Sequence, residues 1–189
     1  MITTSATEAA NLLKNGQVLA YPTEAVWGLG CDPHNEQAFQ EILRLKRRPI
    51  EKGVILLAGQ ISQIEHLLVN LNPEIQKQIV DSWSNRHPAE RATTWLLPAT
   101  KDIPAWIKGN HPKVAVRVTT HPLCIALCHA FNGYIVSTSA NSAGLEPARS
   151  LQEANTYFAN ELNYLNGDLG LSREPSKIID AETGAIIRA

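Results

Sequence analysis

The stretch LRLKRRPIEKGVILLAG, from Leu43 to Gly59, joins a predicted helix to a predicted buried strand. The helix runs towards Lys46 and must end near Arg48, because a residue that precedes a proline is disfavoured in the helical region. The apolar run from Val54 to Ala58 then predicts a strand that is buried on both faces. A sheet covered by helices on both sides is therefore expected.

The same alternation of helices and strands extends along the chain in both directions. Further helices are predicted over 5–16, where Ser5 and Glu8 form a capping box, and over 35–46, 62–68, 73–83, 121–131 and after Ser150. Further strands are predicted over 18–21, 93–99, 114–118 and 134–139, with a closing hairpin in 177–189. This order predicts an α/β fold, with flanking helices on a twisted sheet of mixed parallel and antiparallel strands. The length of 189 residues predicts a single domain over 1–189.

Composition and charge exclude several classes of protein. The formal net charge is −1, so binding to nucleic acid would require a local basic patch. No apolar run approaches the roughly 20 residues of a membrane span, and the N-terminal segment lacks the pattern of a secretory signal. Three cysteines, an odd number, argue against a disulfide framework. A soluble cytoplasmic protein with reduced thiols is expected.

Four cations crowd into seven positions around Pro49: Lys46, Arg47, Arg48 and Lys52. Cations in the last turn of a helix offset the negative end of its dipole, which explains two of them comfortably. The alternative is a clamp for phosphates, in which arginine supplies a planar fork and lysine a mobile point charge. The residues alone leave both readings open.

Two polar segments are candidate binding loops. YPTEAVWGLGCD (21–32) is predicted to leave a strand at Pro22 and to form a glycine-containing loop that backbone N–H groups could line. The alternative is a plain turn, and the segment is neither a Walker A loop nor a dinucleotide fingerprint. IVSTSANSAGLEPARS (135–150) places hydroxyl and amide groups at the end of a buried strand, where α/β sheets bind ligands. Its alternative is a turn that bonds its own backbone.

A metal site is not expected. Cys124 and Cys128 lie four residues apart and His129 follows them, but no second pair of ligands accompanies this group. Packing in the core explains these cysteines better.

Taken together, these motifs resemble the YrdC/Sua5 family, whose members are threonylcarbamoyl-AMP synthases. YPTEAVWGLGCD, LKRRPIEKG, VAVRV, STSAN and SKIID, with Gly184 and Arg188 after them, occur in the family's order over 17–189. The chain resembles the short, TsaC-type form. The resemblance implies a YrdC-like fold with a basic concave face. It also implies formation of threonylcarbamoyladenylate from L-threonine, bicarbonate or CO2, and ATP with Mg²⁺, releasing pyrophosphate. The product would pass to downstream proteins that install t6A at position 37 of tRNA.

The resemblance also assigns residues by position. The family's KxR element falls on Lys46 and Arg48, which are the expected catalytic cations facing the triphosphate. Positions that match nucleotide contacts are Arg48, Lys52, Ser139, Asn141, Pro147 and Arg188. Positions that match the threonine pocket are Thr23, Ala25, Thr94, Arg117, Ser137 and Ser176, with Arg117 open to a phosphate role as well.

Two departures from the family's pattern affect the expected pocket. ERATT stands where many members have PGPxT, so 90–93 receives no assignment, and Ala25 replaces a threonine of many relatives. The alternative function is an RNA-binding module that holds tRNA or double-stranded RNA on the basic face, with affinity that falls steeply with salt.

Overall fold

The computed structural model describes the backbone of residues 1–189 and the side chains of 1–159 and 161–189. The helices are α1 (Ala6–Lys14), α2 (Glu36–Lys46), α3 (Pro73–Ser84), α4 (Ala105–Lys108), α5 (Pro122–Phe131) and α6 (Leu151–Phe158). Shorter 3-10 turns are η1 (Ile50–Lys52), η2 (Ile61–Gln63), η3 (Glu65–Leu67) and η4 (Ala159–Glu161). The strands are β1 (Ile2–Thr3), β2 (Leu19–Pro22), β3 (Trp27–Gly30), β4 (Ile55–Ala58), β5 (Thr93–Pro98), β6 (Lys113–Val118), β7 (Ile135–Ser139), β8 (Asn163–Leu165), β9 (Lys177–Asp180) and β10 (Ile186–Arg188).

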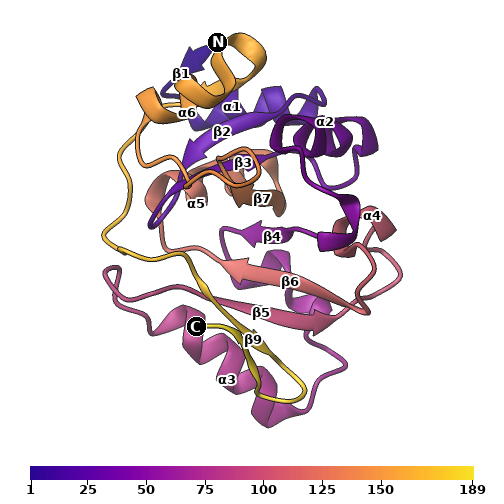
Figure 1. Cartoon of the computed structure of the whole chain (residues 1–189). Coiled ribbons are helices and arrows are strands. Elements are labelled where there is room, and N and C mark those ends of the chain that lie inside the picture. Colours follow the sequence, from indigo (N-terminus) through magenta and orange to yellow (C-terminus); the bar gives the residue numbers. More distant parts are fainter.

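The strands form one mixed sheet in the order β1-β8-β2-β3-β7-β4-β6-β5-β9-β10. The pairs β1–β8, β2–β8, β4–β6 and β5–β9 are parallel, and the others are antiparallel. Figure 1 shows β2, β3 and β7 in the upper half of the molecule and β6, β5 and β9 in the lower half, with β4 between them. The predicted α/β fold with a mixed sheet is confirmed.

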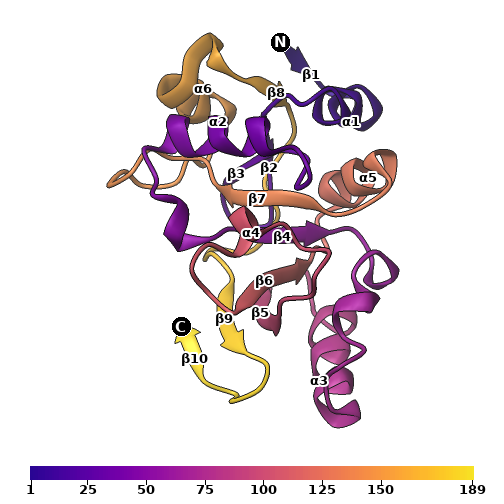
Figure 2. The same cartoon turned by 90° about the vertical axis from the view of Figure 1, so that its right-hand side faces the viewer.

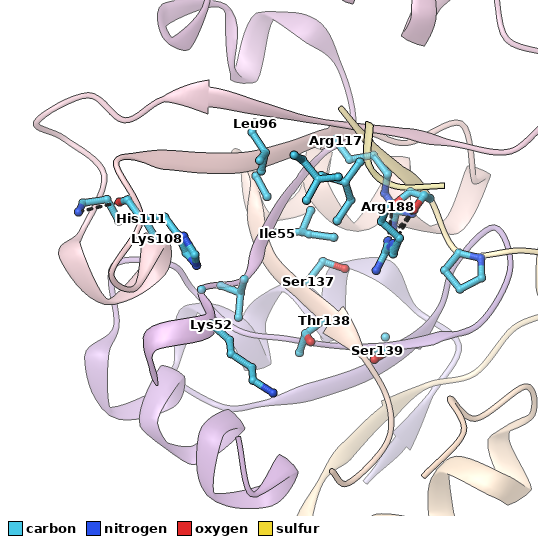
Figure 3. A pocket seen from close by; sticks show the side chains of 18 of the residues that line it. Lys52, Ile55, Leu96, Lys108, His111, Arg117, Ser137, Thr138, Ser139 and Arg188 are labelled. Carbon is cyan, nitrogen blue, oxygen red and sulfur yellow. Dashed lines mark hydrogen bonds between the residues drawn. The ribbon is translucent and has the colours of Figure 1, made fainter. Parts of the chain in front are cut away.

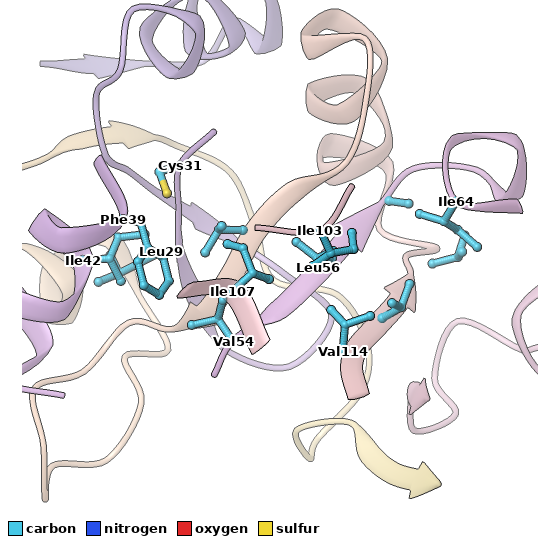
Figure 4. Packing of buried hydrophobic residues seen from close by; sticks show 14 of the residues in the cluster. Leu29, Cys31, Phe39, Ile42, Val54, Leu56, Ile64, Ile103, Ile107 and Val114 are labelled. Carbon is cyan, nitrogen blue, oxygen red and sulfur yellow. The ribbon is translucent and has the colours of Figure 1, made fainter. Parts of the chain in front are cut away.

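Helices cover both faces of the upper strands. α1 and α5 lie side by side on one face, and α2 lies on the other (Figure 2). Leu56 of β4 packs into the larger core cluster, together with Leu29 and Phe39 (Figure 4). The next residue, Leu57, packs into the smaller cluster with Leu13 of α1. Strand β4 is therefore buried on both faces, as predicted, because its consecutive side chains enter opposite core clusters.

The helix starts follow the local chemistry of the sequence. The Ser5 hydroxyl accepts a hydrogen bond from the backbone N–H of Glu8, and the Asn35 side chain accepts one from Ala38. α2 ends at Lys46, and the next residue, Arg47, caps it in the left-handed conformation with φ 50°. These caps confirm the predicted positions of α1 and α2. The predicted capping box is only half formed, because the Glu8 carboxylate accepts from the Thr3 hydroxyl and the Ser5 N–H donates to that hydroxyl.

The predicted helix over 62–68 is wrong, because this segment forms two separate 3-10 turns, η2 and η3. Ile64 stands between the two turns with φ −130° and ψ 3°, outside the helical region, and so interrupts the segment. The Gln63 side chain instead accepts from the N–H of Gly59 and donates to the carbonyl of Cys128, which fixes the first turn.

The glycine-containing loop predicted within 21–32 is also wrong in part, because 27–30 is strand β3. It pairs antiparallel with β2, and only a tight turn joins the two strands. The glycines serve packing: a Cβ on Gly28 would lie 3.4 Å from the Tyr21 ring, and one on Gly30 would lie 2.5 Å from the Val136 carbonyl oxygen. The glycines that resemble a turn therefore belong to a strand, where they leave room for the Tyr21 ring of β2.

Gly30→Ala is expected to lower the free energy of unfolding by about 2 kcal/mol, because the added methyl group forces the central strands apart. A thermal or denaturant melt measures the effect. Gly133→Ala is the matched control, since its Cβ would meet only the Phe131 ring at an ordinary 3.8 Å. Equal stability of the two variants would contradict this account of β3.

Among the described residues, no helix has both the length and the apolar character needed to cross a bilayer. The three cysteines, Cys31, Cys124 and Cys128, are buried free thiols.

Candidate functional site

A cavity of about 510 Å³ opens between the upper and lower halves of the sheet. Its wall comes from several parts of the chain: the β2–β3 turn with the start of β3, the segment 48–55, Leu96 of β5, residues 108–112 with strand β6, the end of β7, and residues 175–176 with the hairpin β9–β10. Figure 3 shows Lys52 at one end of this cavity and Arg117 and Arg188 at the other, with Ser137 between them.

The wall is basic and rich in hydroxyl groups. Its lysines and arginines are Arg48, Lys52, Lys108, Lys113, Arg117 and Arg188. Among the described lining residues the only carboxylate is Asp180, and the Lys113 ammonium neutralises it at 2.7 Å. A concave surface with this excess of cations suits a multiply charged anion.

Most of the predicted site residues meet at this cavity. Those that line it are Thr23, Ala25, Arg48, Lys52, Arg117, Ser137, Ser139, Ser176 and Arg188. Lys46, Thr94, Asn141 and Pro147 are not among the described lining residues. Lining residues that the sequence did not single out include Thr138, Lys108, His111, Lys113 and Asp180. Thr138 and Asp180 stood inside motifs already noted, STSAN and SKIID, whereas the other three carried no local signal.

Arg48 reaches the cavity because the helix stops just before it. Arg47 turns the chain in the left-handed conformation, and Pro49 disfavours the helical region at Arg48, so the next helical turn, η1, begins only at Ile50. One guanidinium nitrogen of Arg48 donates to the Gly53 carbonyl at 2.9 Å, while its buried Nε has no hydrogen-bond partner among the described atoms. Burial lowers the pKa of this guanidinium. A half-desolvated cation with unused donors is well prepared to bind an anion.

Lys46 lies behind the cavity wall. Its ammonium donates to the carbonyl of Ser139, to the carbonyl of Asn141 at 2.8 Å, and to the Asn141 side-chain oxygen at 3.2 Å. Burial, together with the charge of Arg48, lowers the pKa of Lys46 to about 7. The structure thus places Lys46 as a support for the turn that carries Ser139, and not as a group that faces the cavity.

Asn141 also serves this turn. Its side-chain oxygen accepts from the Ser139 hydroxyl at 2.6 Å, and its amide donates to the carbonyls of Ser142 and Leu145. The two sequence elements expected at the site, Lys46/Arg48 and Ser139/Asn141, are therefore joined through the buried Lys46 ammonium.

The opposite end of the cavity is held by the C-terminal hairpin. Arg188 donates to the Ser176 carbonyl at 2.6 and 3.0 Å, and also to the Ser176 hydroxyl at 3.2 Å. The same hydroxyl meets the hydroxyl of the fully buried Thr94 at 2.7 Å. Thr94 therefore orients Ser176 from behind.

The segment 90–93 supports the same end of the cavity. The Arg91 side chain donates to the Pro175 carbonyl at 2.6 Å and forms an ion pair with Glu174 at 2.9 Å. Thr93 begins β5, and its carbonyl accepts from the Trp83 indole. The departure from the family's usual sequence here supplies a tether for the loop that carries Pro175 and Ser176.

Comparisons with known proteins match almost the whole chain. The family of Sua5, YciO and YrdC, described as "Telomere recombination", matches residues 11–189. The threonylcarbamoyl-AMP synthase of Acinetobacter baumannii (strain AYE) is 72% identical over 188 residues, covering 100% of both chains. P. abyssi Sua5, solved with L-threonine, superposes with a TM-score of 0.81 at 26% identity. That match covers 95% of this chain and 54% of the Sua5 chain, so the chain spans about half of it. E. coli YciO shares the fold, with a TM-score of 0.78 at 23% identity. That match covers 97% of this chain and 87% of the YciO chain.

Proposed function

The chain belongs to the Sua5/YciO/YrdC family, and on that premise we propose that the basic cavity is where it forms threonylcarbamoyl-AMP. The activity is that of a nucleotidyltransferase, as in the relatives that match it over their full length. The observation that supports the site is the convergence of the predicted residues, from distant parts of the sequence, on one basic cavity.

The proposed reaction requires positioning more than a protein nucleophile. The threonine amine adds to CO2 with loss of a proton, or to bicarbonate with loss of water, and gives a carbamate. A carbamate oxygen then attacks the α-phosphorus of ATP, the bond to the β-phosphate breaks, and pyrophosphate leaves with the electron pair. Charge builds on phosphate oxygens, so fixed cations and correct alignment supply the catalysis.

We assign the two ends of the cavity to the two charged substrates. Arg48 and Lys52 would face the triphosphate. Ser139, the last residue of β7, also lines the cavity and would offer its hydroxyl group to the nucleotide. Arg117 would face the threonine carboxylate, with Thr23 and Ser176 supplying hydroxyl groups to the same pocket. Ser137 lies between the two ends, where the carbamate would meet the α-phosphate.

Magnesium would enter as part of the ATP substrate. The described residues contain no group of three or more His, Cys, Asp or Glu side chains that could hold a metal ion. Mg²⁺ commonly retains its waters and binds substrate phosphates, so the absence of such a cluster among these residues fits an ion carried by the triphosphate.

The product would supply proteins that install t6A in tRNA, and we propose the cytoplasm as the place of this exchange. RNA contact is a secondary proposal supported by the basic residues around the cavity mouth. If it occurs, affinity for tRNA should fall steeply between 50 and 200 mM salt, on the order of a thousandfold for several phosphate contacts.

Pyrophosphate release from ATP is expected only when threonine, bicarbonate and Mg²⁺ are all present. Each component is omitted in turn, and the adenylate product is identified by mass spectrometry. Release that ignores threonine would indicate a different acceptor. Absence of release, with salt-sensitive binding of tRNA, would favour the RNA-binding alternative.

A further inference from the structure

A buried carboxylate lies directly behind the cavity wall, between two arginines. Glu24 Oε2 forms an ion pair with a guanidinium nitrogen of Arg117 at 3.5 Å but has no hydrogen-bond partner among the described atoms, and Oε1 is 3.4 Å from a guanidinium nitrogen of Arg86. The three side chains are only 3%, 9% and 4% exposed, respectively. Charges this deep are costly unless they are paired, so the pairing is a specific feature of the fold.

Three segments fix the position of Glu24. It stands in the turn between β2 and β3, and its neighbours Thr23 and Ala25 line the cavity. The Thr119 hydroxyl donates to Oε1 at 2.8 Å. The backbone of Gly170 packs closely against the same turn, since a Cβ atom at Gly170 would lie 2.8 Å from the Glu24 Cα. The carboxylate therefore has little freedom to move.

The group is ionised. Burial alone would raise the pKa of Glu24, but the charge of Arg117, the hydrogen bond from Thr119, a backbone hydrogen bond and the charge of Arg86 together outweigh burial and lower it. One negative charge thus stands between two positive charges, which leaves an excess of one positive charge on the cluster.

The two arginines differ in their surroundings. Arg86 is occupied on the far side of Glu24, where it donates to the Thr120 hydroxyl and to the Glu90 carbonyl. Arg117 lines the cavity, and its Nε is buried with no hydrogen-bond partner among the described atoms. Arg117 therefore holds donors that a ligand can use, whereas Arg86 does not.

We propose that Glu24 and Arg86 are positioning residues: Glu24 aims the Arg117 guanidinium at the carboxylate of L-threonine, and Arg86 balances the charge of Glu24. The inference rests on the proposed function and adds two residues that do not touch the substrates. The threonine end is favoured over the phosphate end because Arg117 lies across the cavity from Lys52 (Figure 3).

Three variants test this proposal: Glu24→Gln, Arg86→Met and the double variant. All three are expected to raise the KM for threonine about tenfold or more, with the KM for ATP within about twofold, because each loosens a charged bidentate partner of a carboxylate. Long-range charge alone predicts opposite effects for the two single variants, because Glu24→Gln adds positive charge and Arg86→Met removes it. The threonine-induced increase in Tm should shrink in the same variants, which measures binding without turnover.

The double variant keeps the test decisive if Glu24→Gln does not fold, because it removes one charge of each sign from the interior. Glu41→Gln is the matched control, since Glu41 also forms an ion pair with an arginine, Arg44, but on an exposed helix face. An unchanged KM for threonine in the double variant would overturn the proposal, and so would a lowered KM for threonine in Glu24→Gln. Equal increases in the KM for threonine and the KM for ATP would overturn it as well. A wild-type protein that releases no pyrophosphate with threonine would instead overturn the proposed function.

Discussion

Arg48→Ala is expected to reduce pyrophosphate release by about a hundredfold or more while leaving the protein folded, because it removes one preorganised cation from the proposed triphosphate end. The guanidinium lines the cavity, and its one close partner within the described protein is the Gly53 carbonyl, with a longer 3.4 Å contact to Lys52. Little of the fold depends on it. The kcat at saturating threonine and bicarbonate measures the effect, and a thermal melt confirms folding.

Arg47→Ala is the matched control for this variant. Arg47 is the adjacent residue, is exposed and is not among the described lining residues. The left-handed conformation at position 47, with φ 50°, is unfavourable by about the same free energy for alanine as for arginine, because both carry a Cβ atom. The substitution therefore removes the charge without new backbone strain. Turnover should be nearly unchanged in Arg47→Ala. Full activity in Arg48→Ala would end the assignment of Arg48 to the triphosphate.

The parts of the fold that local chemistry decides could be predicted from the sequence. The caps at Ser5 and Asn35 and the buried strand 55–58 follow from residue types within a few positions of one another. Strand β3 could not be predicted in this way. Its glycines resemble a turn, and the positions of Tyr21 on β2 and of the Val136 carbonyl on β7 show why side chains are excluded there.

The site shows the same limit. Lys46 and Arg48 stand two residues apart, and the sequence cannot tell which of them faces a ligand. The left-handed turn at Arg47 separates them, so Lys46 stays on the buried face of α2 while Arg48 enters the cavity. Glu24 likewise lies in a segment already noted as a candidate loop. Its role depends on Arg86, which is 62 residues away in the sequence.

Lys46→Met is expected to lower both stability and turnover, although Lys46 is not among the described lining residues. The variant removes a donor from three acceptors of the 139–141 turn, two backbone carbonyls and the Asn141 side-chain oxygen. The side-chain oxygen still accepts from the Ser139 hydroxyl, and the Ser139 carbonyl from the Asn141 N–H, so the Asn141 carbonyl is the acceptor left without a partner among the described atoms. One unpaired buried acceptor, together with the two weakened contacts, costs about 2 kcal/mol. The turn also carries the Ser139 hydroxyl into the cavity, and a displacement of about 1 Å there would slow the reaction about a hundredfold. Denaturant melts and kcat measure the two effects.

Lys14→Met separates this buried link from an ordinary lysine contact. The Lys14 ammonium also donates to a backbone carbonyl, that of Ala130 at 2.8 Å, but it is exposed, so water replaces the lost bond. A change within about 0.5 kcal/mol and normal turnover are expected for this control. If Lys46→Met lost turnover with no loss of stability, the ammonium would act on the substrate directly. If it lost neither, the link between α2 and the 139–141 turn would have no role in the site. Loss of both is the result that a positioning role requires, because the same three hydrogen bonds hold the fold and place Ser139.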